Sequence, residues 1–109
     1  MIRFLQVFFT LVLVTMLAVT GWASSHTAIW QIPPSVIGHP WFIATLFDTY
    51  FAFLVFWGWV AYKERTILSR IAWLIAILLL GNIAIAVYML IQLRKLPAGA
   101  QIQDLLIRR

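Results

Sequence analysis

The amino-acid sequence predicts an all-α integral membrane protein with three transmembrane helices and a tight hairpin between the second and the third. Three observations support this prediction. Hydrophobic residues make up 64% of the 109 residues and charged residues only 10%, whereas a globular domain is roughly half apolar and a quarter charged. Three segments reach about twenty predominantly apolar residues, the length that crosses a bilayer as a helix. The eight Lys and Arg residues flank these segments and never interrupt them.

The chain is predicted to form one membrane domain over residues 1–109, with helices at about 4–23, 41–62 and 71–93. The first segment also resembles a secretory signal peptide, because Arg3 precedes the apolar run and Gly21 and Ala23 have the spacing of a cleavage site. We favour a retained helix, since the run is longer than the usual apolar core of about 7 to 15 residues. Residues 63–70 are too few for anything but a tight antiparallel connection.

The segment 24–40 contains no Lys, Arg, Asp or Glu. It is predicted to be a loop along the membrane surface. His39 followed by Pro40 predicts the start of a helix, because proline is favoured in the first turn. Tryptophan is enriched at the boundary between water and lipid, and this boundary is where we expect the side chains of Trp22, Trp30 and Trp41.

The distribution of basic residues predicts the orientation. Arg3 and the three basic residues of 63–70 outnumber Arg94 and Lys95, and basic residues favour the cytoplasmic side. We therefore place the N-terminus and residues 63–70 in the cytoplasm or its organellar equivalent, in a bacterial inner membrane or an organellar membrane. Three spans would put the C-terminal tail, residues 94–109, on the opposite side. The excess of basic residues on the cytoplasmic side disappears if Arg108 and Arg109 are added to Arg94 and Lys95.

Several blocks follow one another along the chain: Pro40-Trp41 followed by IATLFDTY, WVAYKE at 59–64, Trp73, the small residues around Gly81, Tyr88, and a tail ending in DLLIRR. Through these blocks nearly the whole chain resembles a family of small membrane proteins known as domain of unknown function 1475. The resemblance implies no particular activity, but it implies signature positions at Asp48 and at Tyr62-Lys63-Glu64. The chain departs from the family at Asn82, where a small hydroxyl residue is expected, and in its aromatic run 51–59.

Asp48 is a single carboxylate within the second apolar segment. Counted from Trp41 at about 1.5 Å per residue, it lies roughly 10 Å inside the membrane boundary. A charged Asp at the centre of a membrane helix costs about 2.5 to 3.5 kcal/mol, so this side chain should face protein or water.

An antiparallel hairpin turning near residues 66 and 67 brings residues of the second and third helices to the same level. Ala52 then opposes Gly81, and two small residues allow close packing of membrane helices. At a nearby level the hairpin predicts an intramembrane polar cluster of Asp48, Asn82, Tyr88, Thr45 and Thr15. Its role as a register-setting contact is favoured over proton or ligand handling and over contact with a partner subunit.

Other side chains give little sign of chemistry. The chain has no cysteine, and His26 and His39, the only candidates for binding a metal or cofactor, are favoured as capping or interfacial residues. The aromatic residues could line a site for a pigment, quinone or bound lipid, yet they more often form interfacial belts. We read Lys63, Glu64 and Arg65 as a solvated turn whose side chains extend to the membrane surface. No catalytic set, metal site or nucleic-acid-binding face is predicted.

The predicted function is that of a non-catalytic accessory or assembly subunit of a larger membrane complex, in contact with lipids and with other membrane-protein subunits. A chain with almost no soluble part has few other surfaces to offer. The alternative is a small homo-oligomeric transporter or proton carrier that uses Asp48, since one intramembrane carboxylate per subunit suffices for a proton relay. The sequence leaves open the ligand, the partners and the oligomeric state.

Overall fold

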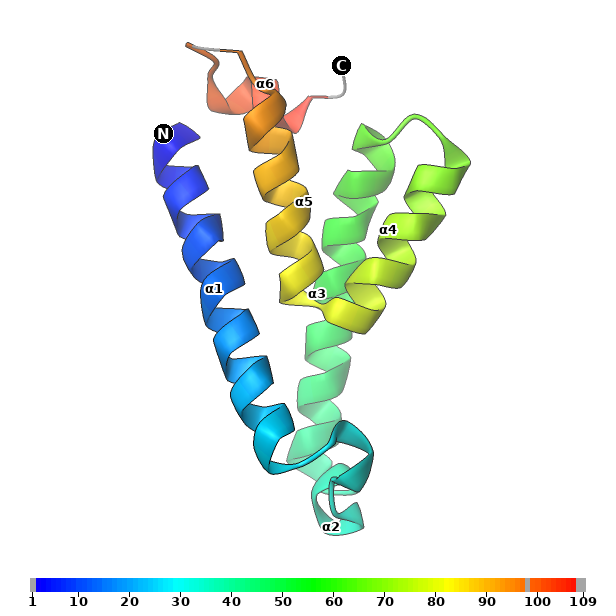
Figure 1. Ribbon diagram of the computed structural model, residues 1–109. Coiled ribbons are helices and arrows are strands. Elements are labelled where there is room, and N and C mark those ends of the chain that lie inside the picture. Colours follow the sequence, from blue (N-terminus) through cyan, green and yellow to red (C-terminus); the bar gives the residue numbers. More distant parts are fainter. Residues whose placement is uncertain (1, 98, 108–109) are drawn as a thin grey trace.

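The computed structural model describes residues 2–97 and 99–107, which fold as helices joined by short connections (Figure 1). No strand occurs in this part of the chain, and the predicted all-helical class is confirmed. The helices are α1 (Ile2–His26), α2 (Pro34–Ile37), α3 (Pro40–Lys63), α4 (Ile67–Leu80), α5 (Asn82–Lys95) and α6 (Ile102–Leu106), with a 3-10 turn, η1, at Ile29–Gln31.

Helices α1 and α3 contain 25 and 24 residues, which corresponds to about 36 Å each. Both are long and apolar enough to cross a membrane, and they include the predicted segments 4–23 and 41–62. The start of α3 agrees with the sequence pattern. The backbone N–H of Trp41 donates to Nδ1 of His39 at 3.2 Å, and Pro40 occupies the first turn, where its missing N–H costs nothing.

The predicted third helix, residues 71–93, is not continuous. Helix α4 ends at Leu80, and α5 begins at Asn82 and runs back along the molecule (Figure 1). Between them Gly81 has φ 60° and ψ −127°, a conformation that side chains with a Cβ rarely adopt. Each of the two helices has 14 residues, or about 21 Å, which is shorter than the roughly 30 Å hydrocarbon core of a bilayer. A helical hairpin therefore replaces the predicted third span.

This reversal changes the predicted position of the C-terminal part. The start of α1, the connection between α3 and α4, and helix α6 all lie at one end of the molecule, and the segment around α2 lies at the other (Figure 1). The three-span prediction put residues 94–107 at the end opposite the start of α1. Arg108 and Arg109 lie outside the described residues.

The hairpin packs between the two long helices, α5 along α1 and α4 along α3. No residue of α1 is buried, and α3 has buried residues only from Phe53 onward. The hydrophobic core therefore occupies the half of the molecule that contains the hairpin. Its buried apolar side chains are Phe53, Val60, Ile77, Ala84, Ala86, Tyr88, Met89, Leu93 and Leu105.

The apex of the hairpin meets α3 at Phe53. A Cβ atom added to Gly81 would lie 3.0 Å from Cζ of Phe53, tighter than nine in ten real Cβ contacts. The predicted partner of Gly81 was Ala52, the preceding residue, whose side chain is exposed. Close approach at Gly81 thus involves an aromatic ring rather than a second small residue.

We predict that Gly81→Ala lowers the free energy of unfolding by roughly 1 to 3 kcal/mol, because alanine is strained at this backbone conformation, and that Gly81→Leu lowers it further by displacing Phe53. The matched control is Gly58→Ala. Gly58 lies in α3 with open space around its Cβ position, so alanine should be neutral or stabilising by up to about 1 kcal/mol. Unfolding in one detergent, followed by circular dichroism, checks both. Equal stability of the two alanine variants would contradict the role of Gly81.

Candidate functional site

Tyr88 of α5 lies in the closed half of the molecule, the half that contains the hairpin and α6. It is fully buried, and three rings from α3 and α4 meet its ring edge-to-face. The centroids of Trp73, Trp59 and Phe56 lie 4.8, 5.8 and 6.1 Å from it. Such aromatic pairs contribute about 0.5 to 1.5 kcal/mol each beyond the area that they bury. We call these four rings the Tyr88 cluster.

The hydroxyl of Tyr88 donates a hydrogen bond to Oε2 of Glu64 at 3.0 Å, whereas the sequence placed Tyr88 in a polar cluster with Asp48. The reversal at Gly81 explains the difference. Tyr88 is seven residues beyond the apex, so it lies about 10 Å back along the hairpin. The same distance along α3, counted from Phe53 toward its C-terminal end, reaches about residue 60. This position agrees with the contact between Tyr88 and Trp59.

Lys63 and Trp59 attach α6 to the end of α3. Nζ of Lys63 donates to the carbonyl oxygens of Leu105 at 2.6 Å and Ile107 at 2.9 Å. Nε1 of Trp59 donates to the carbonyl oxygen of Leu106 at 3.1 Å. These carbonyls lie at the C-terminal end of α6, where helix carbonyls carry partial negative charge. The cation therefore stabilises the helix end and holds it against α3.

The same region closes the connection between α3 and α4. Nε of Arg70 donates to the carbonyl oxygen of Glu64 at 3.1 Å, and Nε1 of Trp57 donates to the carbonyl oxygen of Arg70 at 2.9 Å. Lys63 and Glu64 are partly buried and only Arg65 is exposed, so the prediction of a solvated turn was wrong for these two residues. Trp59 and Lys63 are four residues apart and so lie on one helix face. This spacing could have indicated a shared contact, but no such contact was predicted from the sequence.

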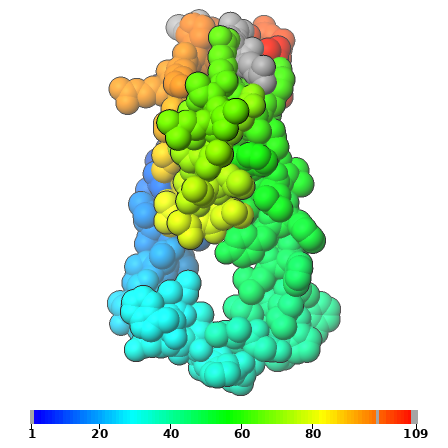
Figure 2. Space-filling model, turned by 90° about the vertical axis from the view of Figure 1, so that its right-hand side faces the viewer, coloured from blue at the N-terminus to red at the C-terminus, as the bar shows by residue number. Residues whose placement is uncertain are grey.

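The other half of the molecule is open. Residues 17–26 of α1 are exposed, and in residues 41–52 of α3 only Phe42 and Thr49 are partly covered. The hairpin ends at Gly81 and leaves an opening below it (Figure 2). We call this opening the window. It is bounded by α1, the segment 27–39, the first half of α3 and the hairpin apex.

Asp48 lies in the uncovered part of α3, five residues or about 7.5 Å beyond Phe53. It is exposed and forms no hydrogen bond or ion pair with any described residue. Thr45 is also exposed, and its hydroxyl donates to the carbonyl oxygen of Trp41 at 2.8 Å. Thr15 and Asn82 are exposed as well. The structure therefore does not close the predicted polar cluster within the chain.

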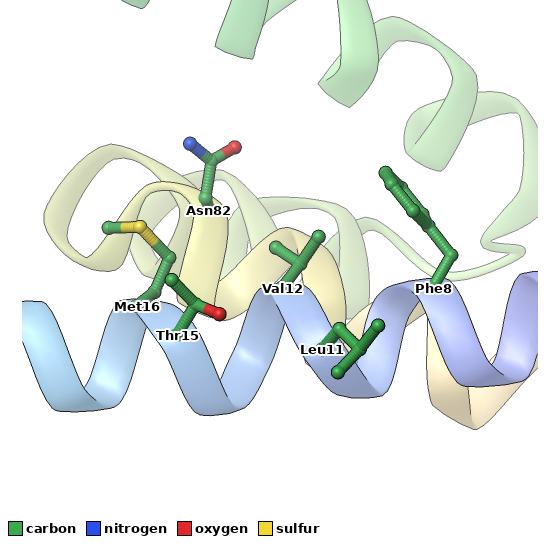
Figure 3. A pocket seen from close by; sticks show the side chains of 6 residues that line it. All are labelled: Phe8, Leu11, Val12, Thr15, Met16 and Asn82. Carbon is green, nitrogen blue, oxygen red and sulfur yellow. The ribbon is translucent and has the colours of Figure 1, made fainter.

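Thr15 and Asn82 instead line one cavity of about 320 Å³ between α1 and the start of α5, which we call the apex pocket (Figure 3). The Asn82 side chain points away from α1. One amide and one hydroxyl in an apolar wall suit a hydrocarbon chain or a small neutral group, and they supply neither a nucleophile nor a base. The other lining residues are Phe8, Leu11, Val12 and Met16.

The two histidines lie outside these features. Nδ1 of His26 is 2.9 Å from the carbonyl oxygen of Trp22, and His39 caps α3. Within the described residues, no three His, Cys, Asp or Glu side chains group closely enough to hold a metal ion. Each histidine thus has a local contact near a helix end.

Comparison with known proteins gives one match. The family described as "Protein of unknown function (DUF1475)" matches residues 7–108, a range that includes the Tyr88 cluster, Lys63, Glu64, Asp48 and the hairpin apex. No curated protein and no solved structure matches the chain.

We predict that Tyr88→Phe destabilises the fold by about 1.5 kcal/mol. This value is the lower end of the range for hydrogen bonds to charged groups, because Glu64 is only partly buried. The control is Tyr50→Phe. The Tyr50 hydroxyl is 3.4 Å from the carbonyl oxygen of Leu78 in an exposed position, so its loss should cost less than about 0.5 kcal/mol. Detergent unfolding curves of the two variants measure the difference, and equal losses would show that the bond to Glu64 contributes nothing.

Proposed function

The chain belongs to the DUF1475 family, and we propose that it is a non-catalytic integral membrane protein that serves as an accessory or assembly subunit of a larger membrane complex. The observation that carries this proposal is Asp48, which is exposed in the uncovered half of α3 without a partner in the described chain. A surface of this kind inside a membrane needs a second component to cover it.

In the proposed placement α1 and α3 cross the bilayer, and the α4–α5 hairpin enters from one side and returns. Two features support it. All six described basic residues lie at the end from which the hairpin enters, and segment 24–40 at the other end has none. Basic residues favour the cytoplasm, so both ends of the described chain would face it. The tryptophans at the opposite end are well exposed, as in an interfacial belt: Trp22, Trp30 and Trp41.

This placement puts Asp48 and the hairpin apex in the hydrocarbon region. An uncovered charged Asp there costs about 2.5 to 3.5 kcal/mol. A break in helical backbone at membrane depth is stable only where protein or water surrounds it, and the apex at Gly81 borders the open window. A transmembrane helix of another subunit, seated in the window with a polar group toward Asp48, would satisfy both requirements.

A second candidate function is a small homo-oligomeric transporter or proton carrier. The observation that favours it is the position of the hairpin apex beside the window (Figure 2), on the same molecule whose α3 exposes Asp48. Transporters use broken helices of this kind near the bilayer midplane to surround the transported species. In this case several copies would gather so that their windows enclose a water-filled path, and Asp48 would carry the proton.

The proposed topology predicts the labelling of three single-cysteine variants, made in a chain that has no cysteine of its own. Ser69→Cys and Gln103→Cys should react with a membrane-impermeant reagent from the same side, and Ser25→Cys from the other. The comparison of intact and inverted vesicles makes the measurement. If Gln103→Cys labels together with Ser25→Cys, the segment 71–93 crosses the membrane once and the re-entrant placement is wrong.

The proposed role predicts that Asp48→Leu separates the protein from its complex and leaves the isolated chain as stable as the wild type, because Asp48 has no partner within the described residues. Asp48→Asn, which keeps the shape and much of the hydrogen bonding, should remain assembled. Val55→Ala is the control, since Val55 is 78% exposed on the same helix but beyond the apex. Extraction in a gentle detergent, native sizing and identification of co-purifying chains make the measurement.

The outcomes of that experiment separate the two functions. Unrelated subunits that are lost with Asp48→Leu support the accessory role. A homo-oligomer without other chains supports the transporter, and Asp48→Asn should then stay assembled but lose pH-dependent transport. Assembly unchanged in Asp48→Leu would exclude Asp48 as the contact in either role.

A further inference from the structure

We propose that α1 carries a binding site for an anionic phospholipid, whose phosphate lies between Arg3 and Arg94 and whose acyl chain follows α1 toward Asn82. This inference goes beyond the proposed function and shares only its membrane placement. It rests on three cavities that follow one another along α1, each sharing a lining residue with the next.

The first cavity, the head pocket, has a volume of about 630 Å³ and lies between the start of α1 and the end of α5. Arg3, from the first turn of α1, and Arg94, from the last turn of α5, both line it, together with Gln6. Both arginines are exposed, and neither forms an ion pair with a described residue. Guanidinium groups bind phosphate through paired hydrogen bonds, and two of them on different helices can hold one phosphate from two sides.

The head pocket continues along α1 as an apolar groove. A cavity of about 240 Å³ is lined by Gln6, Val7, Thr10 and Leu11, and it shares Gln6 with the head pocket. The apex pocket of about 320 Å³ shares Leu11 with this cavity. The three cavities therefore adjoin one another along α1, with one lining residue common to each neighbouring pair.

The groove follows a regular spacing on α1. Arg3, Val7, Leu11 and Thr15 are four residues apart, so each side chain neighbours the next one and lies about 40° further around the helix. The distance from Arg3 to Thr15 along the axis is about 18 Å. One leaflet of a hydrocarbon core of about 30 Å is roughly 15 Å thick. A headgroup held at Arg3 would thus place its acyl chain along the groove to the middle of the bilayer.

Charge decides which lipid the site takes. No Asp or Glu lines any of the three cavities, so nothing there would receive the cationic group of a zwitterionic headgroup. Basic pockets between membrane helices on the cytoplasmic side bind anionic headgroups. A free phosphate would use only the two arginines and leave the groove empty, whereas a phospholipid occupies both.

The test uses the full chain, purified in detergent, stripped of lipid and loaded with phosphatidylglycerol or phosphatidylcholine. Native mass spectrometry counts the retained lipid. We expect the wild type to retain phosphatidylglycerol in preference to phosphatidylcholine. Each of Arg3→Gln and Arg94→Gln should weaken retention by about fivefold, and the double variant by roughly thirtyfold, from about 1 kcal/mol for each arginine near the surface. Arg65→Gln is the control, because Arg65 is exposed at the same end but lines none of the three cavities.

A second pair of variants tests the groove. Leu11→Ala should weaken retention of the long-chain lipid, whereas Leu17→Ala, an exposed position on α1 outside the groove, should not. Competition by soluble glycerol phosphate at the concentration of the lipid would show a phosphate site without a lipid site and overturn the proposal. So would equal retention of the two lipids, or an equal loss in Arg65→Gln. Because retained lipid is measured on the isolated chain, the result does not depend on whether a partner subunit exists.

Discussion

The reversal of the backbone at Gly81 is the constraint on which the rest of the structure depends. With φ 60° and ψ −127°, this residue ends α4 and sends α5 back along the molecule. The turn places α5 against α1 and α4 against α3. It also brings α6 to the end where α1 begins (Figure 1). Because the hairpin stops beside Phe53, the first half of α3 and the second half of α1 have no helix between them.

The result is a molecule with one closed and one open half. The closed half is held by the Tyr88 cluster, by the hydrogen bond from Tyr88 to Glu64 and by the hydrogen bonds from Lys63 to the end of α6. These contacts come from segments far apart in the chain. No buried side-chain nitrogen or oxygen among the described residues lacks a hydrogen-bond partner. The open half contains the window and Asp48. The assembly role proposed above uses this open half, in which an exposed carboxylate lies among exposed apolar side chains.

The two proposals meet at the hairpin apex. The window borders it on one side, and the groove along α1 reaches it at the apex pocket, where Thr15 and Asn82 are lining residues. An acyl chain in that groove would lie next to a helix seated in the window. Lipid and partner would then share apolar surface, so that occupation of one site changes the surface available to the other. Such a coupling needs no conformational change, because the two sites are next to each other.

The sequence by itself determined the helical class, the two long apolar helices and the start of α3, because apolar composition, helix length and the cap formed by His39 and Pro40 are local properties. It also singled out Gly81, Tyr88 and the block 59–64, although not their contacts. Only the tertiary structure decided that residues 71–93 form two helices of opposite direction. An apolar run has the same composition whether the chain continues or turns back at a glycine. The direction of α5 decides which residue of α3 lies beside each residue after Gly81, including the partner of Tyr88. The carboxylate that meets Tyr88 was therefore Glu64, at the helix end, and Asp48 was left exposed in the uncovered half of α3.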